Sequence, residues 1–153
     1  MIVVRRASPD DAALLGDHRA QVLYEHGEHE PQAVTAQIRV WTAWMRGALA
    51  REAYVGFIAF DDELVAGSAS LLVHEAVPRP GYAGANDGRV HSVYVIPAMR
   101  RRGVARMLMA ALLAYARTSD VMRLTLHPTS MSRALYATMG FETLDEMGLY
   151  FGP

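Results

Sequence analysis

The sequence contains no cysteine and no lysine, and each absence excludes a kind of chemistry. Without cysteine the chain has no disulfide, no thiolate metal site and no cysteine nucleophile, which favours a reducing compartment. Without lysine it has no Schiff-base residue and no P-loop lysine, so all 15 positive side chains are arginines. A membrane-spanning apolar run and a signal-peptide pattern are also missing. We therefore expect a soluble, cytoplasmic protein with no membrane partner.

The length and composition favour one domain over residues 1–153. Hydrophobic residues make up 52% of the 153 positions, which is enough to bury a single core. The formal net charge is −1, unlike that of a protein that binds nucleic acid through a strongly basic surface. No repeat or linker divides the chain, so we expect one domain and no nucleic-acid partner.

Alternating strand-like and helix-like segments predict an α/β domain with a mixed sheet. The strand-like segments are rich in β-branched and aromatic residues, whereas the helix-like segments repeat apolar residues at helical spacing. The expected strands are residues 2–6, 53–60, 64–74, 89–96, 121–127, 141–144 and 147–151. The expected helices are residues 8–26, 32–51, 101–117 and 130–140, and the segment 75–88, which contains several Pro and Gly, is an expected loop.

The stretch PAMRRRGVARML, at residues 97–108, places three arginines and a glycine between an expected strand and an expected helix. The first turn of a helix leaves backbone N–H groups unpaired, and the helix dipole adds partial positive charge there. Gly103 would let an anion approach the backbone, and arginines would add charge-assisted hydrogen bonds. The stretch is therefore a candidate pyrophosphate site. The alternative is a helix start with solvated arginines.

Two motifs together resemble the GNAT superfamily of acetyl-CoA-dependent N-acetyltransferases. The first is R-x-x-G-x-A at residues 100–105, after a hydrophobic strand that ends in proline. The second is Leu-Tyr at 135–136 on a short helix, followed by Gly-Phe at 140–141. Thr129 stands where the family often has asparagine, which weakens one cofactor contact. The resemblance implies an α/β (α+β) fold, with a mixed, mostly antiparallel sheet of six to seven strands flanked by about four helices.

The resemblance also implies an activity. It implies transfer of acetyl from acetyl-CoA to a primary amine of a small molecule, without a metal. Direct attack in a ternary complex is expected, because no cysteine exists to carry the acetyl group. Two alternatives stay open: acetylation of a protein or peptide amine, and a catalytically silent acyl-CoA-binding regulatory module. The identity of the amine, the use of other acyl groups and the oligomeric state are not specified, although homodimers are common in the family.

The same resemblance assigns the cofactor site. Val93 and Val95 would pair with the pantetheine arm through main-chain atoms, and the N–H of Val93 would be the oxyanion donor. The N–H groups of residues 101–105 would hold the pyrophosphate, with Arg100 nearby. The full set of implied cofactor-binding residues is Val93, Tyr94, Val95, Arg100, Arg101, Arg102, Gly103, Val104, Ala105, Thr129 and Ser132.

Tyr136 matches the family's usual general acid, which would protonate the sulfur of CoA; the alternative is a core aromatic residue. The general base is left open. Where some members carry a glutamate this chain has Arg89, which cannot accept a proton. His91 lies two residues further along the same strand face and is a candidate base. The alternatives are that His91 is only a packed or surface histidine, and that an ordered water carries the proton. Weaker candidates for the base are His74, Glu75 and Asp87.

Two loops are expected to border the acceptor site. The segment EHGEHE at 25–30 has the residue types of a metal site but no recognised spacing, so we interpret it as a solvated loop. As a hypothesis, its glutamates, which include Glu25 and Glu28, would favour a cationic amine. In the segment 75–88, Arg79 and Tyr82 would contact a carboxylate or ring of the acceptor, and the alternative is a plain surface loop.

Overall fold

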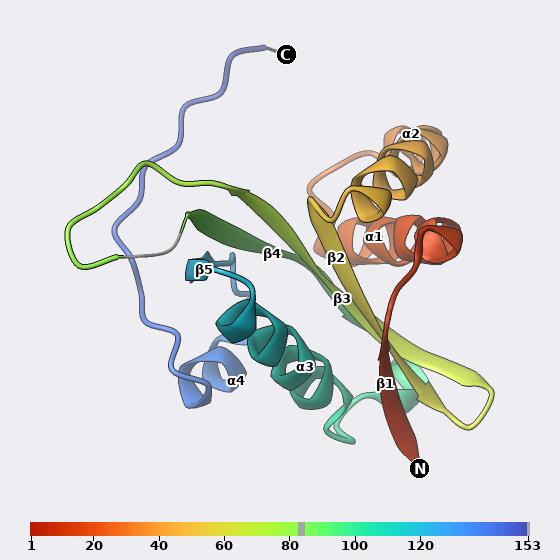
Figure 1. Ribbon diagram of the computed structural model, residues 1–153. Helices are drawn as coiled ribbons and strands as arrows, with labels where there is room; N and C mark the ends of the chain where they lie inside the picture. The colour runs from red at the N-terminus through yellow and green to blue at the C-terminus, as the bar shows by residue number, and fades with distance from the viewer. Residues whose placement is uncertain (83–84, 153) are drawn as a thin grey trace.

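The computed structural model describes residues 1–82 and 85–152, and it contains one five-stranded sheet (Figure 1). The strands follow the order β1-β2-β3-β4-β5 across the sheet. Neighbouring strands from β1 to β4 are antiparallel, and β5 is parallel to β4. The sheet is therefore mixed and mostly antiparallel, which confirms the expected fold class. The strand bounds are β1 (Ile2–Arg6), β2 (Tyr54–Asp61), β3 (Leu64–Glu75), β4 (Asn86–Val95) and β5 (Val121–Thr125).

Two helices lie on each face of the sheet (Figure 1). On one face, α1 and α2 pack together and against β2. On the other, α3 packs across β2 and β3, and α4 lies beside it. Short 3-10 turns precede α1 and follow β4. The helix bounds are α1 (Ala12–His26), α2 (Pro31–Ala50), α3 (Val104–Thr118) and α4 (Arg133–Thr138).

The alternation of side chains along β2 divides them between two apolar cores. Tyr54 and Ile58 pack with α1 and α2, whereas Val55 and Phe57 pack with α3. Successive residues of a strand point to opposite faces, so a strand that is covered on both faces is apolar throughout. The run YVGFIAF in β2 has this composition, and it lies in the middle of both cores.

The pairing of β4 is irregular just before the arginine-rich loop. Its register with β3 shifts, so that two residues of β4, Ser92 and Val93, lie opposite Ala69 alone. Ser92 has the left-handed backbone that such bulges use, with a φ of +52°. On the other side, pairing with β5 ends where Arg89 meets Thr125. In the described part of the chain, the edge of β4 that faces β5 therefore has no strand partner beyond Arg89.

Several element ends differ from the expected ones for local reasons. The third helix begins at Val104 instead of residue 101, because Arg101 and Gly103 adopt positive φ values of +63° and +82°. The expected loop at 75–88 is shorter, since its last three residues pair with β3 as the start of β4; residues 83 and 84 lie outside the described ones. The last helix covers only Arg133–Thr138 of the expected segment.

The two strands expected at 141–144 and 147–151 are wrong. Within the described residues this segment forms no strand, and it runs away from α4 as an irregular chain (Figure 1). An apolar pattern makes a strand only when a neighbouring strand supplies hydrogen bonds, and here none does. The sheet consequently has five strands instead of six to seven. The large apolar side chains left exposed are Leu144, Met147, Leu149, Tyr150 and Phe151.

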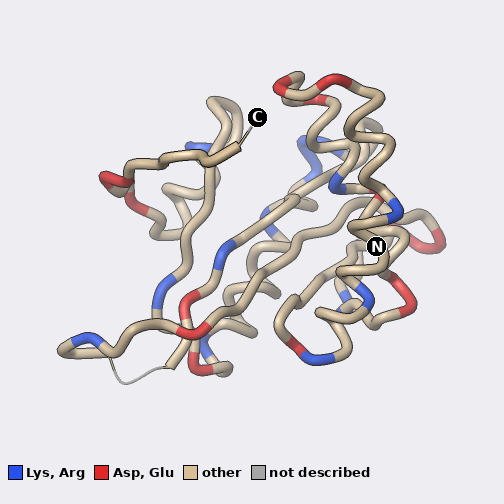
Figure 2. Tube along the Cα trace, turned by 90° about the horizontal axis from the view of Figure 1, so that it is seen from above, with Lys and Arg blue, Asp and Glu red and all other residues tan. Residues whose placement is uncertain are grey.

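Figure 2 shows basic and acidic positions spread over the fold. Of the helices in residues 1–82 and 85–152, none is long and apolar enough to cross a bilayer. The same residues contain no group of three His, Asp or Glu side chains that could hold a metal ion.

Candidate functional site

A cleft of about 510 Å³ lies where β4 and β5 separate. One wall is the segment 90–95 of β4, and the opposite wall is the segment 126–132 that follows β5. Tyr136 of α4 also lines the cleft. Backbone N–H and C=O groups that lack a strand partner need another hydrogen-bond partner. The free edge of β4 can therefore pair with an extended ligand, as the assignment of Val93, Tyr94 and Val95 requires.

The N-terminus of α3 lies directly after this strand and suits an anion. Gly103 is its N-cap, and no side chain caps the helix. The first-turn N–H groups of Val104 and Ala105 are therefore free for a ligand. A Cβ built on Gly103 would meet no atom within 4 Å, so the approach to this turn is open. Free N–H groups, the helix dipole and an open approach together fit a phosphate group.

Arg100 uses two of its three guanidinium nitrogens for contacts within the chain. Its Nε donates to the carbonyl oxygen of Val95 over 2.9 Å, and its Nη2 donates to the carboxylate of Glu25 on α1. The guanidinium also lies 5.9 Å from the ring centre of Tyr94. Arg100 therefore holds the end of β4 against α1. Because Glu25 is paired in this way, its charge is not free to attract a cationic amine.

The two arginines that follow differ from each other. Nη1 of Arg102 lies 3.0 Å from the sulfur of Met99 and 4.0 Å from a carboxylate oxygen of Asp61. Arg101 makes no ion pair within the residues that the structure describes. Arg101 is consequently the arginine of this loop that is available to an anion at the α3 N-terminus.

Thr129 and Ser132 line the cleft and form reciprocal hydrogen bonds with each other. The N–H of Thr129 donates to Oγ of Ser132 over 2.8 Å, and the N–H of Ser132 donates to Oγ1 of Thr129 over 3.2 Å. Their two hydroxyls lie 2.9 Å apart. This reciprocal pair fixes the turn before α4. Both residues lie where the sequence placed them, but a side-chain contact to a ligand would compete with this turn.

Tyr136 is both a core residue and a residue of the cleft. Its side chain is 7% exposed and packs edge-on against Phe141, with ring centres 5.8 Å apart. Burial raises the pKa of the Tyr136 hydroxyl, and a hydrogen bond with Ser132 partly offsets this. The hydroxyl therefore keeps its proton at neutral pH, which is the form that a general acid must have.

His91 lines the same cleft, but its acid–base properties differ from those expected. Burial, followed by the positive charges of Arg19, Arg89 and His127, lowers the pKa of His91 to about 4. The ring is therefore neutral at pH 7 and holds a proton only weakly. The expectation that the pKa of His91 suits a general base is not met.

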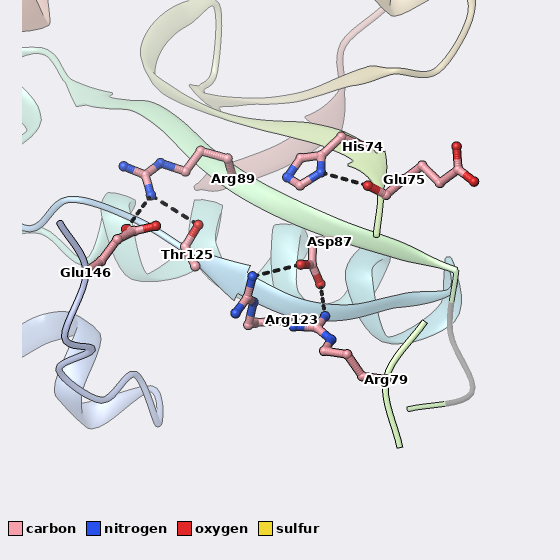
Figure 3. Close-up of polar contacts among 8 residues, drawn as sticks. All are labelled: His74, Glu75, Arg79, Asp87, Arg89, Arg123, Thr125 and Glu146. Atoms are coloured by element: carbon pink, nitrogen blue, oxygen red, sulfur yellow. Dashed lines mark hydrogen bonds and ion pairs between the residues drawn. The ribbon is translucent and has the colours of Figure 1, made fainter. Parts of the chain in front are cut away.

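The weaker candidates for the base lie outside both cavities of the site. The carboxylate of Asp87 is held between Arg79, at 2.6 Å, and Arg123, at 2.9 Å (Figure 3). His74 lies at the outer end of β3, next to the exposed Glu75, whose carbonyl oxygen is 3.2 Å from its Nδ1 (Figure 3). Both carboxylate oxygens of Asp87 therefore accept hydrogen bonds from guanidinium groups.

The residues expected to contact the acceptor are not gathered around the cleft. Arg79 is bound to Asp87, and the exposed ring of Tyr82 lies 4.8 Å from its guanidinium. Glu28 lies in the exposed connection between α1 and α2 and lines neither cavity. Of the four residues expected to contact the acceptor, Glu25 alone lines the cleft.

A second cavity, of about 620 Å³, adjoins the cleft. The two share Leu126, His127 and Tyr136, so Tyr136 has access to both. Arg89 of β4 and several residues of the segment 141–150 after α4 also line it. A cleft and an adjoining cavity that meet at a buried proton donor can hold two reactants side by side.

Sequence reasoning missed Arg19, which lies close to the site. Arg19 sits in the middle of α1, and its Nη1 donates to Oγ of Ser92 in the β4 bulge over 3.3 Å. The ring of Trp41 lies 5.1 Å from its guanidinium. Nothing in the local sequence distinguishes this arginine from a solvated one, because its role depends on where α1 crosses β4.

Comparison with known proteins agrees with this geometry. The model of the acetyltransferase (GNAT) family matches residues 16–141, and no curated protein matches the sequence. A GCN5-related N-acetyltransferase from Ralstonia eutropha JMP134 is 25% identical, with a TM-score of 0.87 over 99% of both chains. A predicted acetyltransferase with acetyl-CoA from Clostridium acetobutylicum is 21% identical, with a TM-score of 0.87 over 99% of this chain and 96% of that one. An aminoglycoside N-acetyltransferase in complex with CoA is 18% identical, with a TM-score of 0.68 over 99% and 95%.

Proposed function

Because the chain belongs to the GNAT acetyltransferase family, we propose that it transfers acetyl from acetyl-CoA to a primary amine of a small molecule. The observation that carries the proposal is a combination of three features, two of which line the cleft while the third follows β4 directly. These are the unpaired edge of β4, the uncapped N-terminus of α3 and the buried, protonated Tyr136. Direct attack in a ternary complex follows from the absence of cysteine.

The residues present fit the cofactor. Acetyl-CoA would supply the acetyl group as an activated thioester. The first-turn N–H groups of Val104 and Ala105, with the guanidinium of Arg101, would bind its pyrophosphate. The main-chain groups of Val93, and the N–H of Val95, whose carbonyl oxygen accepts from Arg100, would bind its extended arm. The presence of acetyl-CoA in the Clostridium acetobutylicum protein supports this choice of cofactor.

Two groups of the chain would act during transfer. The N–H of Val93 would donate to the carbonyl oxygen, where negative charge develops as the amine attacks. Tyr136 would give its proton to the departing sulfur, since its raised pKa keeps the hydroxyl protonated. Amines have pKa values near 10, so His91, with a pKa of about 4, is a poor acceptor for the amine proton. That proton would leave through water in the cleft.

A small acceptor is favoured over a protein by the second cavity. Its volume of about 620 Å³ is in the range of small-molecule sites, and it meets the cleft at Tyr136. The aminoglycoside N-acetyltransferase with the same fold acts on a small amine, which is consistent with this choice.

The test presents small amines and peptides together. The purified protein, with acetyl-CoA, is given a pool of small primary amines and a pool of peptides with free α-amines, and mass spectrometry identifies the acetylated products. Acetylated small amines that disappear with the Tyr136→Phe variant would support the proposal. If peptides are acetylated and the small amines are not, the protein acetylates proteins or peptides instead.

A further inference from the structure

Arg89 and His91 project toward the face of the sheet that α1 and α2 cover. Arg89 pairs with Leu72 and His91 pairs with Ser70 in the antiparallel register of β3 and β4. Directly opposite residues of such a pair share a face of the sheet. Leu72 packs against the core formed by α1 and α2, so its partner lies on that side as well. The contact of Arg19 with the β4 bulge comes from the same side, from α1.

The guanidinium groups of Arg19 and Arg89 are held in place by neutral groups. Arg19 is positioned by the hydroxyl of Ser92 and the ring of Trp41. Arg89 donates to the hydroxyl of Thr125 over 3.1 Å (Figure 3). Each arginine is thus oriented, but its charge is not neutralised by these partners.

Carboxylates are scarce around these two arginines. Within residues 1–82 and 85–152, Arg19 has no carboxylate at ion-pair distance, and Arg89 has only Glu146, at 3.9 Å. The side chain of Glu146 is 67% exposed and belongs to the irregular segment after α4, so this pair is weak (Figure 3). Two residues earlier on the same strand, Asp87 is matched by two arginines at 2.6 and 2.9 Å. The positive charge near Arg89 is therefore a local feature, not a property of the whole strand.

The low pKa of His91 is consistent with unneutralised positive charge around Arg19 and Arg89. After burial, the groups that lower it are Arg19, Arg89 and His127, and no carboxylate is among the causes. The position also borders the reacting groups. His91 and Ser92 line the cleft with Val93 and Tyr136, and Arg89 lines the adjoining cavity that shares Tyr136. A group bound by these arginines would lie beside the place where acetyl transfer occurs.

We propose that the amine acceptor carries an anionic group, a carboxylate or a phosphate, which binds between Arg19 and Arg89. This inference rests on the proposed function and specifies its substrate class. Guanidinium groups recognise both anions through paired hydrogen bonds, and an oriented, partly buried arginine loses little freedom when it binds one. The acceptor is then a small molecule with the amine at one end and the anion at the other, in place of the purely cationic amine that the glutamate loop indicated.

The first test compares acceptors that differ by one anionic group. Ethanolamine is paired with phosphoethanolamine, and phenethylamine with L-phenylalanine, so that phosphate and carboxylate are distinguished. We expect kcat/KM to be roughly tenfold or more higher for the anionic member of at least one pair. The variants Arg19→Gln and Arg89→Gln should each remove most of that ratio. Arg117→Gln changes an exposed arginine of α3 on the opposite face and should leave the ratio unchanged.

The outcomes separate the inference from the function on which it rests. If both amines that lack the anionic group are acetylated as well as their anionic partners, the anion site is wrong and the acetyltransferase stands. If none of the four amines is acetylated, the anion site is tested by binding alone. NMR then follows the titration of the histidine rings with each compound in the absence of acetyl-CoA. Phosphoethanolamine, unlike ethanolamine, should then raise the pKa of His91 in the native protein and not in Arg89→Gln. Equal titration curves with the two compounds would overturn the proposal.

Discussion

Gly67 of β3 lies so close to β4 that a Cβ added to it would be 2.3 Å from the carbonyl oxygen of Tyr94. No real Cβ tolerates this distance to a backbone atom, so even alanine would push the end of β4 away from β3. That end carries Val95, whose main chain is proposed to bind the cofactor. The close packing of β4 against β3 at this point therefore requires glycine at position 67.

We predict that Gly67→Ala lowers both stability and cofactor affinity. The free energy of unfolding should fall by about 1–3 kcal/mol, as for other overpacked core sites. The Kd for CoA, measured by calorimetry, should rise roughly tenfold because β4 shifts. Gly47→Ala is the matched control, since Gly47 lies in the interior of α2 with only the end of the flexible Arg51 side chain nearby. Native-like CoA affinity in Gly67→Ala would show that this end of β4 does not hold the cofactor.

Removing the hydroxyl of Tyr136 tests its role as general acid. Tyr136→Phe keeps the ring and its packing against Phe141, so the fold should survive. We expect kcat to fall by roughly 10²–10⁴, with the Kd for CoA changed little. Steady-state kinetics with the best amine, together with CoA calorimetry, measures both quantities. An unchanged kcat would assign Tyr136 to the core alone.

The anion site at the start of α3 should depend more on main-chain N–H groups than on side-chain charge. Gly103→Glu places a carboxylate at a residue with φ +82° and repels a phosphate, so it should weaken CoA binding more than Arg101→Ala. Gly103→Ala separates the two effects, because it keeps the backbone cost and adds no charge. If Arg101→Ala gives the larger rise in Kd, arginine charge is the dominant contribution.

Stability should fall on acidification because His91 is buried among positive charges. Its pKa in the folded state is about 4 and its ordinary value is 6.5, so the unfolded chain binds more protons between these pH values. The free energy of unfolding therefore decreases as the pH falls from 7 to 4, by at most about 3 kcal/mol from this group. Urea unfolding at pH 7.5 and 4.5 should show a smaller loss in His91→Gln. The buried His18, whose pKa is also lowered, is present in both proteins, so an equal loss would contradict the assignment to His91.

The sequence predicted the parts of the site that depend on local order. A strand, a tight turn with Gly103 and a helix follow one another along the chain, so the sequence alone predicts a candidate anion site there, and the structure has these elements in that order. The position of Tyr136 before a Gly-Phe pair was informative in the same way. The family match over residues 16–141 agrees with both motifs.

What the sequence did not predict depends on contacts between distant segments. Arg100 pairs with Glu25, 75 positions earlier in the chain, although the sequence predicted it only as a phosphate contact. Arg19 meets Ser92 across 73 positions. The apolar residues after α4 predicted strands, but strand formation requires a neighbour, and the pattern alone cannot supply one. In each case the outcome depends on which element packs beside the residue.

The most direct test of acetyl transfer by this protein is the initial rate of CoA thiol release from acetyl-CoA, measured with and without a panel of small primary amines. We predict release that depends on the amine, with one acetylated amine formed for each thiol. We also predict rates that vary with both substrates as expected for a ternary complex. Tight CoA binding without amine-dependent release, for every amine in the panel, would contradict this prediction and would identify the chain as a silent acyl-CoA-binding module.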